Sequence, residues 1–311
     1  MGQPGVWLKG RRRGKPPGSA VLMIVSASYR TDIPAFYAGW FMDRLDAGFA
    51  RVRNPYGGRP NTVSLRTGAV DGFVFWTRNA APMARHWDQV RRVAPFYLQF
   101  TLTAYPRALE AGTLAPAAAL RQMRDLARRF GPRAMVWRYD PIVLSTITPP
   151  DWHVANFARL ARALAGIVDE VVISFVQPYR KTVRNLDSAA RAYGFTWRDP
   201  GDDEKLTLVA QLVAIVRGAG MQLTLCTQPH LVVAGAGEAR CIDAARLSVI
   251  AGRPIAAREK GNRAGCRCTE SRDIGAYDSC AQGCVYCYAV ADRHRAAEQL
   301  KRHDAAAPAL G

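Results

Sequence analysis

The sequence of 311 residues lacks several patterns that would assign it to a common class of protein. It has no run of about 18 apolar residues, so we expect no membrane-spanning helix and no membrane partner. No Gly-x-Gly-x-x-Gly pattern follows a candidate strand, which argues against a dinucleotide-binding first turn. The five histidines form no metal-ligand pattern, and no serine–histidine–aspartate order indicates a hydrolase of that kind.

Lysine is scarce, because 6 lysines accompany 37 arginines in a chain whose formal net charge is +18. A charge of this size is compatible with a nucleic-acid partner. The arginines are spread along the whole chain, however, and together with the abundant alanine they are typical of a GC-rich coding sequence. A nucleic-acid partner is therefore an alternative and not the favoured prediction.

Cysteine is infrequent but unevenly placed, since five of the seven cysteines fall between Cys266 and Cys287. A secreted disulfide framework more often has an even number of cysteines, spread through a smaller chain. Clustered thiols in a chain of this length indicate metal binding in a reducing cytoplasm. We therefore predict a cytoplasmic protein.

Apolar runs of strand length alternate with helical patterns about six times, which predicts a parallel sheet with helical crossovers. The six predicted strands are Val21–Ser28, Gly72–Trp76, Phe96–Leu102, Ala134–Trp137, Val171–Val176 and Gln222–Cys226. An open doubly wound sheet and a partial or complete (β/α) barrel both fit this alternation.

Polar residues follow all six predicted strands, as they do at the active-site end of a barrel, and they favour the barrel. They are Arg30, Asp32, Thr77, Arg78, Asn79, Thr101, Thr103, Arg138, Asp140, Gln177, Thr227 and Gln228.

Composition divides the chain into four segments. Residues 1–19 are rich in arginine, glycine and proline and are predicted to be a disordered basic tail. Residues 20–235 form the predicted barrel-like domain, and residues 236–302 form a loop-rich, cysteine-rich module that ends in a helix. Residues 303–311 are predicted to be a loose tail.

The most informative stretch is Cys280-Ala281-Gln282-Gly283-Cys284-Val285-Tyr286-Cys287. Its C-x3-C-x2-C spacing can turn three thiolates toward one point, and it offers no obvious fourth ligand. Three protein ligands leave a metal centre with an open position, which is the arrangement expected of a catalytic site and not of a structural one. The alternatives are a zinc knuckle that borrows a fourth ligand and an exposed cysteine loop, although zinc sites usually have paired C-x2-C arms.

This octapeptide resembles the C-x3-C-x-aromatic-C signature of the radical S-adenosylmethionine (SAM) superfamily, with Tyr286 at the aromatic position. The resemblance implies that Cys280, Cys284 and Cys287 hold three irons of a [4Fe-4S] cluster and that SAM chelates the fourth iron. It also implies that Tyr286 covers the cluster edge and that Gly283 allows the tight turn between ligands.

The same resemblance implies a six-stranded partial barrel, a partial (β/α)6 TIM-like fold. It implies an enzyme that cleaves SAM reductively to a 5′-deoxyadenosyl radical, which then acts on a substrate that the sequence does not identify. Such an enzyme takes its electron from a donor such as a ferredoxin or a flavodoxin.

The remaining four cysteines are the number that a second, fully protein-ligated [4Fe-4S] cluster or a structural zinc ion needs. We predict this second metal site, with iron–sulfur favoured over zinc, at Cys226, Cys241, Cys266 and Cys268. Their spacing is irregular, and the simpler alternative is that Cys226 and Cys241 are small buried hydrophobic residues.

Four charged residues at the strand ends are the candidate catalytic residues: Arg30, Asp32, Arg138 and Asp140. A guanidinium can pair bidentately with the SAM carboxylate or with an anionic substrate. The two carboxylates are candidates for contacts with a ribose or an amine. An equally weighted alternative is a buried ion-pair network that ties the barrel together.

Several phrases outside the cysteine loop resemble an uncharacterised prokaryotic family, domain of unknown function family 1848. They are Ser26-Ala27-Ser28-Tyr29-Arg30-Thr31-Asp32-Ile33-Pro34, Val52-Arg53-Asn54-Pro55, Phe75-Trp76-Thr77-Arg78-Asn79, Gln99-Phe100-Thr101-Leu102-Thr103 and Trp137-Arg138-Tyr139-Asp140-Pro141. With residues 273–289 the resemblance spans roughly residues 21–290, and it implies little about substrate.

The position of the cysteine loop departs from the radical SAM pattern. In that superfamily the loop usually follows the first barrel strand, whereas here it lies near the C-terminal end of the sequence. Either the barrel is circularly permuted, or the C-terminal module folds back over the barrel mouth.

The sequence thus predicts a radical SAM-like iron–sulfur enzyme. One alternative is an iron–sulfur electron-transfer or redox-sensing protein without SAM chemistry. The other is a zinc-containing nucleic-acid-binding protein.

Overall fold

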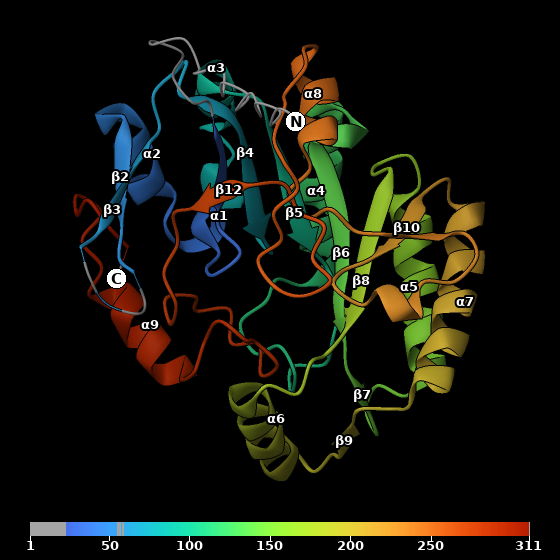
Figure 1. Cartoon of the computed structure of the whole chain (residues 1–311). Coiled ribbons are helices and arrows are strands. Elements are labelled where there is room, and N and C mark those ends of the chain that lie inside the picture. The colour runs from blue at the N-terminus through green and yellow to red at the C-terminus, as the bar shows by residue number, and fades with distance from the viewer. Residues whose placement is uncertain (1–22, 55–56, 58, 311) are drawn as a thin grey trace, which may run out of the picture.

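The computed structural model describes residues 23–54, 57 and 59–310 as a mixed α/β protein with a central parallel sheet (Figure 1). The predicted basic tail of residues 1–19 lies outside the described residues, as do Val21 and Leu22 of the first predicted strand. None of the helices within this described part is long and apolar enough to cross a membrane.

The central sheet contains all six predicted strands and two short strands that were not predicted. Its members are β1 (Met23–Ala27), β4 (Val70–Thr77), β5 (Phe96–Thr101), β6 (Met135–Ile142), β8 (Glu170–Phe175), β10 (Gln222–Leu225), β11 (Ala236–Glu238) and β12 (Ser271–Asp273). Two further pairs are antiparallel and lie outside this sheet: β2 (Phe49–Val52) with β3 (Asn61–Ser64), and β7 (Leu144–Ser145) with β9 (Trp197–Arg198).

The order of the strands separates the two predicted topologies. From β1 to β11 each successive strand adds on the same side, so the described sheet has no reversal of order as a doubly wound sheet has. Strand β12 adds in parallel on the other side of β1. Read round a circle, the order of the eight strands is their order along the chain, but β11 and β12 do not pair. The described residues therefore form an open parallel sheet and not a closed barrel.

Helices follow most of the strands. They are α1 (Ile33–Phe36), α2 (Ala38–Ala47), α3 (Trp87–Val93), α4 (Pro116–Phe130), α5 (Pro150–Leu164), α6 (Arg180–Tyr193), α7 (Asp202–Gly218), α8 (Ala244–Ala251) and α9 (Arg293–Lys301), with 3-10 turns at Ala81–Met83, Pro132–Ala134 and Pro229–Leu231. Pro116 and Pro150 occupy the first positions of α4 and α5, where a missing N–H costs nothing. Gly48 ends α2 in the left-handed conformation, at φ +77°.

The two faces of the sheet have different covers. Alternate strand residues point to opposite faces. Val25, Phe75, Leu98, Trp137 and Ile173 belong to the core packed against helices α1 to α5 and α7. Their neighbours on the other face pack against residues 239–268, which include helix α8, and these neighbours are Ile24, Val74, Tyr97, Val136 and Val172.

The predicted cysteine-rich module therefore shares both the sheet and a core with the predicted barrel-like domain. The boundary predicted at residue 235 falls between β10 and β11, two paired strands of the same sheet.

The last described residues, which were predicted to be a loose tail, pack against α2 and β2. The indole Nε1 of Trp40 donates to the carbonyl oxygen of Ala307 at 2.9 Å. The backbone N–H of Arg51 donates to the carbonyl oxygen of Pro308 at 2.7 Å. Leu310 is only 3% exposed.

Candidate functional site

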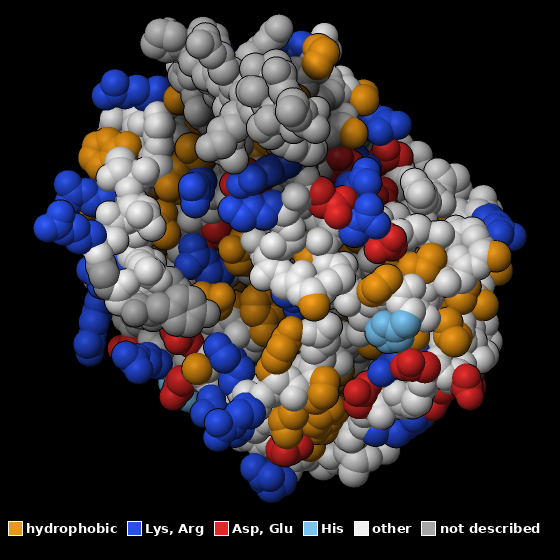
Figure 2. Space-filling view, in the orientation of Figure 1, with side chains coloured by type: hydrophobic (Ala, Val, Ile, Leu, Met, Phe, Trp, Pro, Cys, Tyr) orange, Lys and Arg blue, Asp and Glu red, His pale blue; other side chains and the backbone are white. Residues whose placement is uncertain are grey.

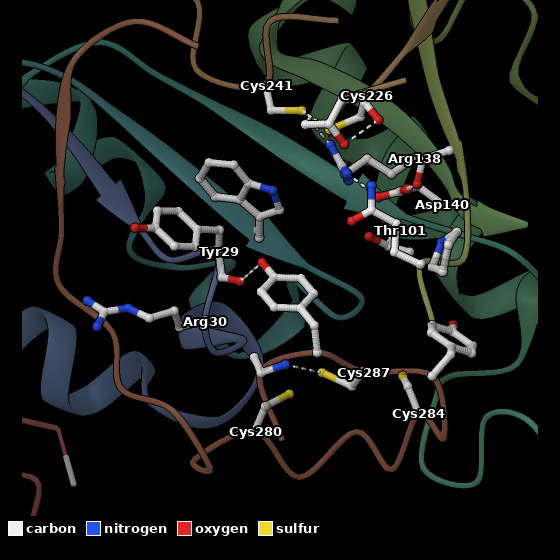
Figure 3. A pocket seen from close by; sticks show the side chains of 18 of the residues that line it. Tyr29, Arg30, Thr101, Arg138, Asp140, Cys226, Cys241, Cys280, Cys284 and Cys287 are labelled. Atoms are coloured by element: carbon white, nitrogen blue, oxygen red, sulfur yellow. Dashed lines mark hydrogen bonds and ion pairs between the residues drawn. The ribbon is translucent and has the colours of Figure 1, made fainter. Parts of the chain in front are cut away.

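A cavity of about 420 Å³ lies at the carboxyl ends of the strands, and all seven cysteines of the chain line it. Residues near the carboxyl ends of β1, β4, β5, β6, β8 and β10 form its walls, and they include all of the predicted polar strand-end residues except Asn79, Thr103 and Gln228. The cavity separates the cysteines into the two predicted groups. Figure 3 shows Cys226 and Cys241 beside Arg138 at one end, and Cys280, Cys284 and Cys287 at the other.

The loop from Cys280 to Cys287 follows β12 and packs against the loop between β5 and α4. The backbone N–H of Val285 donates to the carbonyl oxygen of Leu109 at 3.1 Å, and that of Gly112 donates to Gln282 at 3.0 Å. Gly283 has a φ of +75°, a conformation that glycine adopts without strain. This agrees with the turn predicted for it.

Asp32 holds the cysteine loop from the β1 side. One carboxylate oxygen accepts the backbone N–H of Ala35 and caps α1, and the other accepts the backbone N–H of Arg78 and the side-chain amide of Gln282, both at 2.8 Å. Burial raises the pKa of Asp32, although these hydrogen bonds act in the opposite direction. In this arrangement Asp32 positions the loop.

A buried charged cluster of Arg78, Glu110, Tyr286 and Thr103 lies behind the loop. Arg78 Nη1 is 2.9 Å from the Glu110 carboxylate, and Arg78 Nη2 donates to the Tyr286 hydroxyl at 2.6 Å. The Tyr286 hydroxyl also donates to Glu110. Burial lowers the pKa of Arg78, but Cys284 and Glu110 raise it more, so the guanidinium stays charged.

Sequence reasoning had used Arg78 only as one of many polar strand ends, and it missed Glu110. The position of Arg78 after β4 is the signal that could have identified it. Glu110 lies in an irregular loop with no pattern around it, so no such signal existed.

Arg30 is engaged in an ion pair with Asp273 of β12. Its Nε donates to the Asp273 carboxylate at 2.8 Å, and the same carboxylate accepts the hydroxyls of Ser26 and Ser28 at 2.6 and 2.8 Å. This network joins β1 to the strand that leads into the cysteine loop. It is an arrangement of the kind given as the alternative role for Arg30.

Arg138 and Asp140 form an ion pair at the other end of the cavity. Asp140 also accepts the Ser174 hydroxyl, and Arg138 Nη1 donates to Cys241 Sγ at 3.0 Å. Arg138 is therefore next to the second cysteine group. The structure places all four candidate charged residues on the cavity wall.

The four cysteines of the second group contact one another in a chain. The Sγ atoms of Cys241 and Cys226 are 3.6 Å apart, and the Cys268 thiol hydrogen-bonds with those of Cys241 and Cys266. A second guanidinium lies close, with Arg263 Nη2 at 3.9 Å from Cys226 Sγ. Within the described ranges, no three His, Cys, Asp or Glu side chains are grouped as ligands of a single metal ion.

Burial is the main influence on the pKa values of the three thiols of the cysteine loop. It raises the pKa of Cys280 and Cys287, and it raises the pKa of Cys284 to about 12. Cys266 in the second group differs, since its hydrogen bond with Cys268 lowers its pKa to about 6. The loop thiols therefore carry their protons at neutral pH, and a metal that binds them must displace those protons.

A family model matches most of the chain. The comparison with curated proteins finds no similar protein, and the comparison with solved structures finds no similar structure. The model of the family described as Domain of unknown function (DUF1848) matches residues 24–289. This range includes all seven cysteines, and it includes every strand of the central sheet apart from the first residue of β1. The chain therefore belongs to this DUF1848 family.

Proposed function

We propose that the protein is an iron–sulfur enzyme of the radical SAM type. The observation that carries this proposal is the convergence of all seven cysteines on one cavity, with three on a single loop and four at the opposite end. A cavity between two such groups offers space for a substrate, which a simple electron carrier does not need. The polar strand ends around it have the position of active-site residues in parallel α/β folds.

The cysteine loop suits a cluster with three protein ligands. Cys280, Cys284 and Cys287 would hold the [4Fe-4S] cluster, and the fourth iron would be left for SAM. A cubane cluster keeps its thiolates on separate irons and therefore farther apart than a single ion does. When bound, the reduced cluster and SAM supply a 5′-deoxyadenosyl radical that abstracts hydrogen from the substrate.

The residues around the loop have roles that follow from their contacts. Asp32 and Gln282 fix the loop against β1 and α1. Arg78 brings a buried positive charge close to Cys284, where it would offset the negative charge of ligating thiolates. Tyr286 is held by Arg78 and Glu110, so its ring cannot swing away from the loop.

The strand order supports a permuted form of the radical SAM barrel. The cysteine loop follows β12, and β12 pairs in parallel with β1. With β12 counted first, the cysteine loop follows the first strand, and β1, β4, β5, β6 and β8 come next in order. This is the position that the superfamily gives to its cysteine loop. The partial barrel remains part of this proposal.

The second group would hold a second metal centre. Arg138 and Arg263 lie beside its sulfurs and would offset the charge of four thiolates. A [4Fe-4S] cluster is the favoured occupant by analogy with the first site, and it would require the Sγ atoms of Cys226 and Cys241, which are 3.6 Å apart, to separate onto different irons. Zinc is the alternative, because Cys226 and Cys241 are close enough to bind one ion.

Electron paramagnetic resonance (EPR) of the anaerobic, dithionite-reduced protein tests the proposal, together with iron, zinc and sulfide analysis. We expect a [4Fe-4S]+ signal that changes shape when SAM is added. A variant with Cys280, Cys284 and Cys287 replaced by Ala should lose the SAM-sensitive signal. The matched control, with Cys226, Cys241, Cys266 and Cys268 replaced by Ala, should keep it.

Other outcomes point to the alternatives. A cluster signal indifferent to SAM would support an iron–sulfur electron-transfer or redox-sensing protein. Zinc without iron in both groups would support the zinc-containing protein. If SAM cleavage survives in the Cys280→Ala variant, the proposal is wrong.

A further inference from the structure

Exposed tyrosines gather at the mouth of the cavity. Among the described residues, five large hydrophobic side chains are strongly exposed, and three of them line this cavity. These are Tyr179, Tyr277 and Tyr288, which are 42%, 38% and 39% exposed. Tyr29 and Trp76 line the cavity as half-buried rings, with their centroids 6.0 Å apart. Figure 2 shows hydrophobic side chains around a hollow near the centre of this face, with Lys and Arg side chains beside them.

Positive side chains lie against these rings. The Lys181 ammonium is 5.5 Å from the ring centroid of Tyr277, and the Arg263 guanidinium is 5.9 Å from that of Tyr288. Arg263 also donates to the Tyr179 hydroxyl at 3.3 Å. Neither cation forms an ion pair with a carboxylate of the described residues.

Three cations near Arg263 in the sequence, by contrast, are paired with carboxylates. Arg258 and Lys260 both bind Glu270, and Arg267 binds Glu238 and Glu259. Lys181 therefore remains available for an external anion, whereas Arg263 also lies 3.9 Å from Cys226 Sγ and would face both the second cysteine group and the mouth. Exposed aromatic faces beside unpaired cations match the chemistry of a strand of phosphates and planar bases.

We propose that the cavity mouth binds single-stranded nucleic acid. Bases stack on Tyr179, Tyr277 and Tyr288, and backbone phosphates lie near Lys181 and Arg263. One base enters the cavity between the two cysteine groups. This inference rests on the proposed function, because it names the substrate class of that same site. The net charge of +18 adds a general attraction for a polyanion.

Binding of short fluorescein-labelled oligonucleotides to the full-length protein tests this inference by fluorescence anisotropy. Single-stranded DNA and RNA of the same sequence are the probes, and an abasic strand of equal length is their control. Tyr179→Ala and Tyr277→Ala should each weaken binding about tenfold, as expected for the loss of one stacked base. Tyr193→Ala removes an exposed tyrosine from the same helix as Lys181 and should bind as the wild type.

The abasic strand should bind at least tenfold more weakly than the normal strand. The tighter of the DNA and RNA probes indicates which of the two nucleic acids the mouth is built to bind. Lys181→Gln and Arg263→Gln should each reduce the slope of log affinity against log salt concentration by about one. The inference is overturned if the mouth variants bind as Tyr193→Ala does, or if the abasic strand binds as tightly as the normal one.

The two proposals fail separately. If oligonucleotides do not bind but SAM still changes the EPR signal, only the substrate class is wrong. If they bind through the tyrosines and SAM has no effect on the signal, the mouth is a nucleic-acid site and the radical chemistry is wrong.

Discussion

At the scale of single residues, the buried ion pair between Arg78 and Glu110 is one of the features that hold the cysteine loop in place. Arg78 is 11% and Glu110 2% exposed, and the pair holds Tyr286 of the cysteine loop. Each charge is tolerated in the interior only because of the other and of the hydrogen bonds around both. Removal of one charge would leave the other without compensation.

We expect Glu110→Gln to lower the free energy of unfolding by about 3 kcal/mol, because it leaves the Arg78 guanidinium buried and unpaired. Chemical denaturation measures this change. Glu298→Gln is the control, since Glu298 pairs with Lys301 at an exposed site and its loss should cost well under 1 kcal/mol. Equal effects of the two substitutions would show that the Arg78 pair contributes no more than a surface pair.

His153 should make stability depend on pH. It is fully buried between the Tyr139 hydroxyl and the carbonyl oxygen of Val143, and burial lowers its pKa from 6.5 to about 4. As the pH falls, the His153 imidazole therefore becomes protonated near pH 6.5 in the unfolded chain, but only near pH 4 in the folded chain. The contribution of His153 to stability is complete above pH 6.5 and is lost as the pH falls toward 4.

This loss should amount to about 3 kcal/mol between pH 6.5 and 4. Denaturation curves across that interval measure it. His153→Asn should flatten the pH dependence whatever its effect on stability at neutral pH, whereas His230→Asn, at an exposed position, should leave the dependence unchanged. An unaltered slope in His153→Asn would exclude His153 as its source.

At the scale of elements, the C-terminal segment after α9 behaves as part of the core. Residues 306–308 supply backbone acceptors to Trp40, Arg44 and Arg51, and Leu310 is buried against the same cluster. The absence of a helical or strand pattern in this segment suggested a tail. Its backbone hydrogen bonds go to α2 and β2, and a sequence pattern does not record such distant partners.

Leu310→Ala should lower the free energy of unfolding by about 2–3 kcal/mol, because it removes methyl groups from a packed site. Val249→Ala shortens an aliphatic side chain that is 60% exposed, and it should change stability by less than about 0.5 kcal/mol. Thermal or chemical denaturation compares the two. If both variants are as stable as the wild type, the segment is not held in its packed position.

Sequence patterns located the six predicted strands because both faces of the sheet are covered and most of the strand residues are buried and apolar. The two short strands escaped for a physical reason. Ala236–Glu238 and Ser271–Asp273 contain few apolar residues, and they are strands only because β10 and β1 offer them open edges. Pairing of this kind depends on the neighbour and not on local propensity.

At the scale of the whole molecule, the site combines residues from β1, from the middle of the chain and from the cysteine loop. The spacing of Cys280, Cys284 and Cys287 predicted one group, and counting the remaining cysteines predicted the other. Their meeting in one cavity could not be predicted, because it depends on β12 returning to pair with β1, where Ser26 lies opposite Asp273, 247 residues further along the chain. The tyrosines at the mouth became recognisable only when their exposure was known.

Metal at the second cysteine group should stiffen the segment that covers the sheet. Cys226 follows β10, whereas Cys266 and Cys268 belong to residues 239–268, which connect β11 to β12 and pack on one face of the sheet. Cys241→Ser should therefore speed hydrogen exchange in residues 257–270 and lower the melting temperature of the metal-loaded protein. Cys284→Ser should affect residues 279–288 instead. If both variants exchange alike in both segments, the two groups do not act as separate centres.

Because β12 pairs with β1, the last strand of the sheet to be synthesised joins the first one. A ribosome makes β1 to β11 in the order in which they stand side by side, so each new strand can dock on the one made before it. The strand that leads into the cysteine loop comes last and must find the oldest edge of the sheet. A metal centre held by Cys280, Cys284 and Cys287 could therefore be completed only after residue 287 has left the ribosome. A product that stops before residue 271 would carry most of the sheet and none of the three-cysteine site.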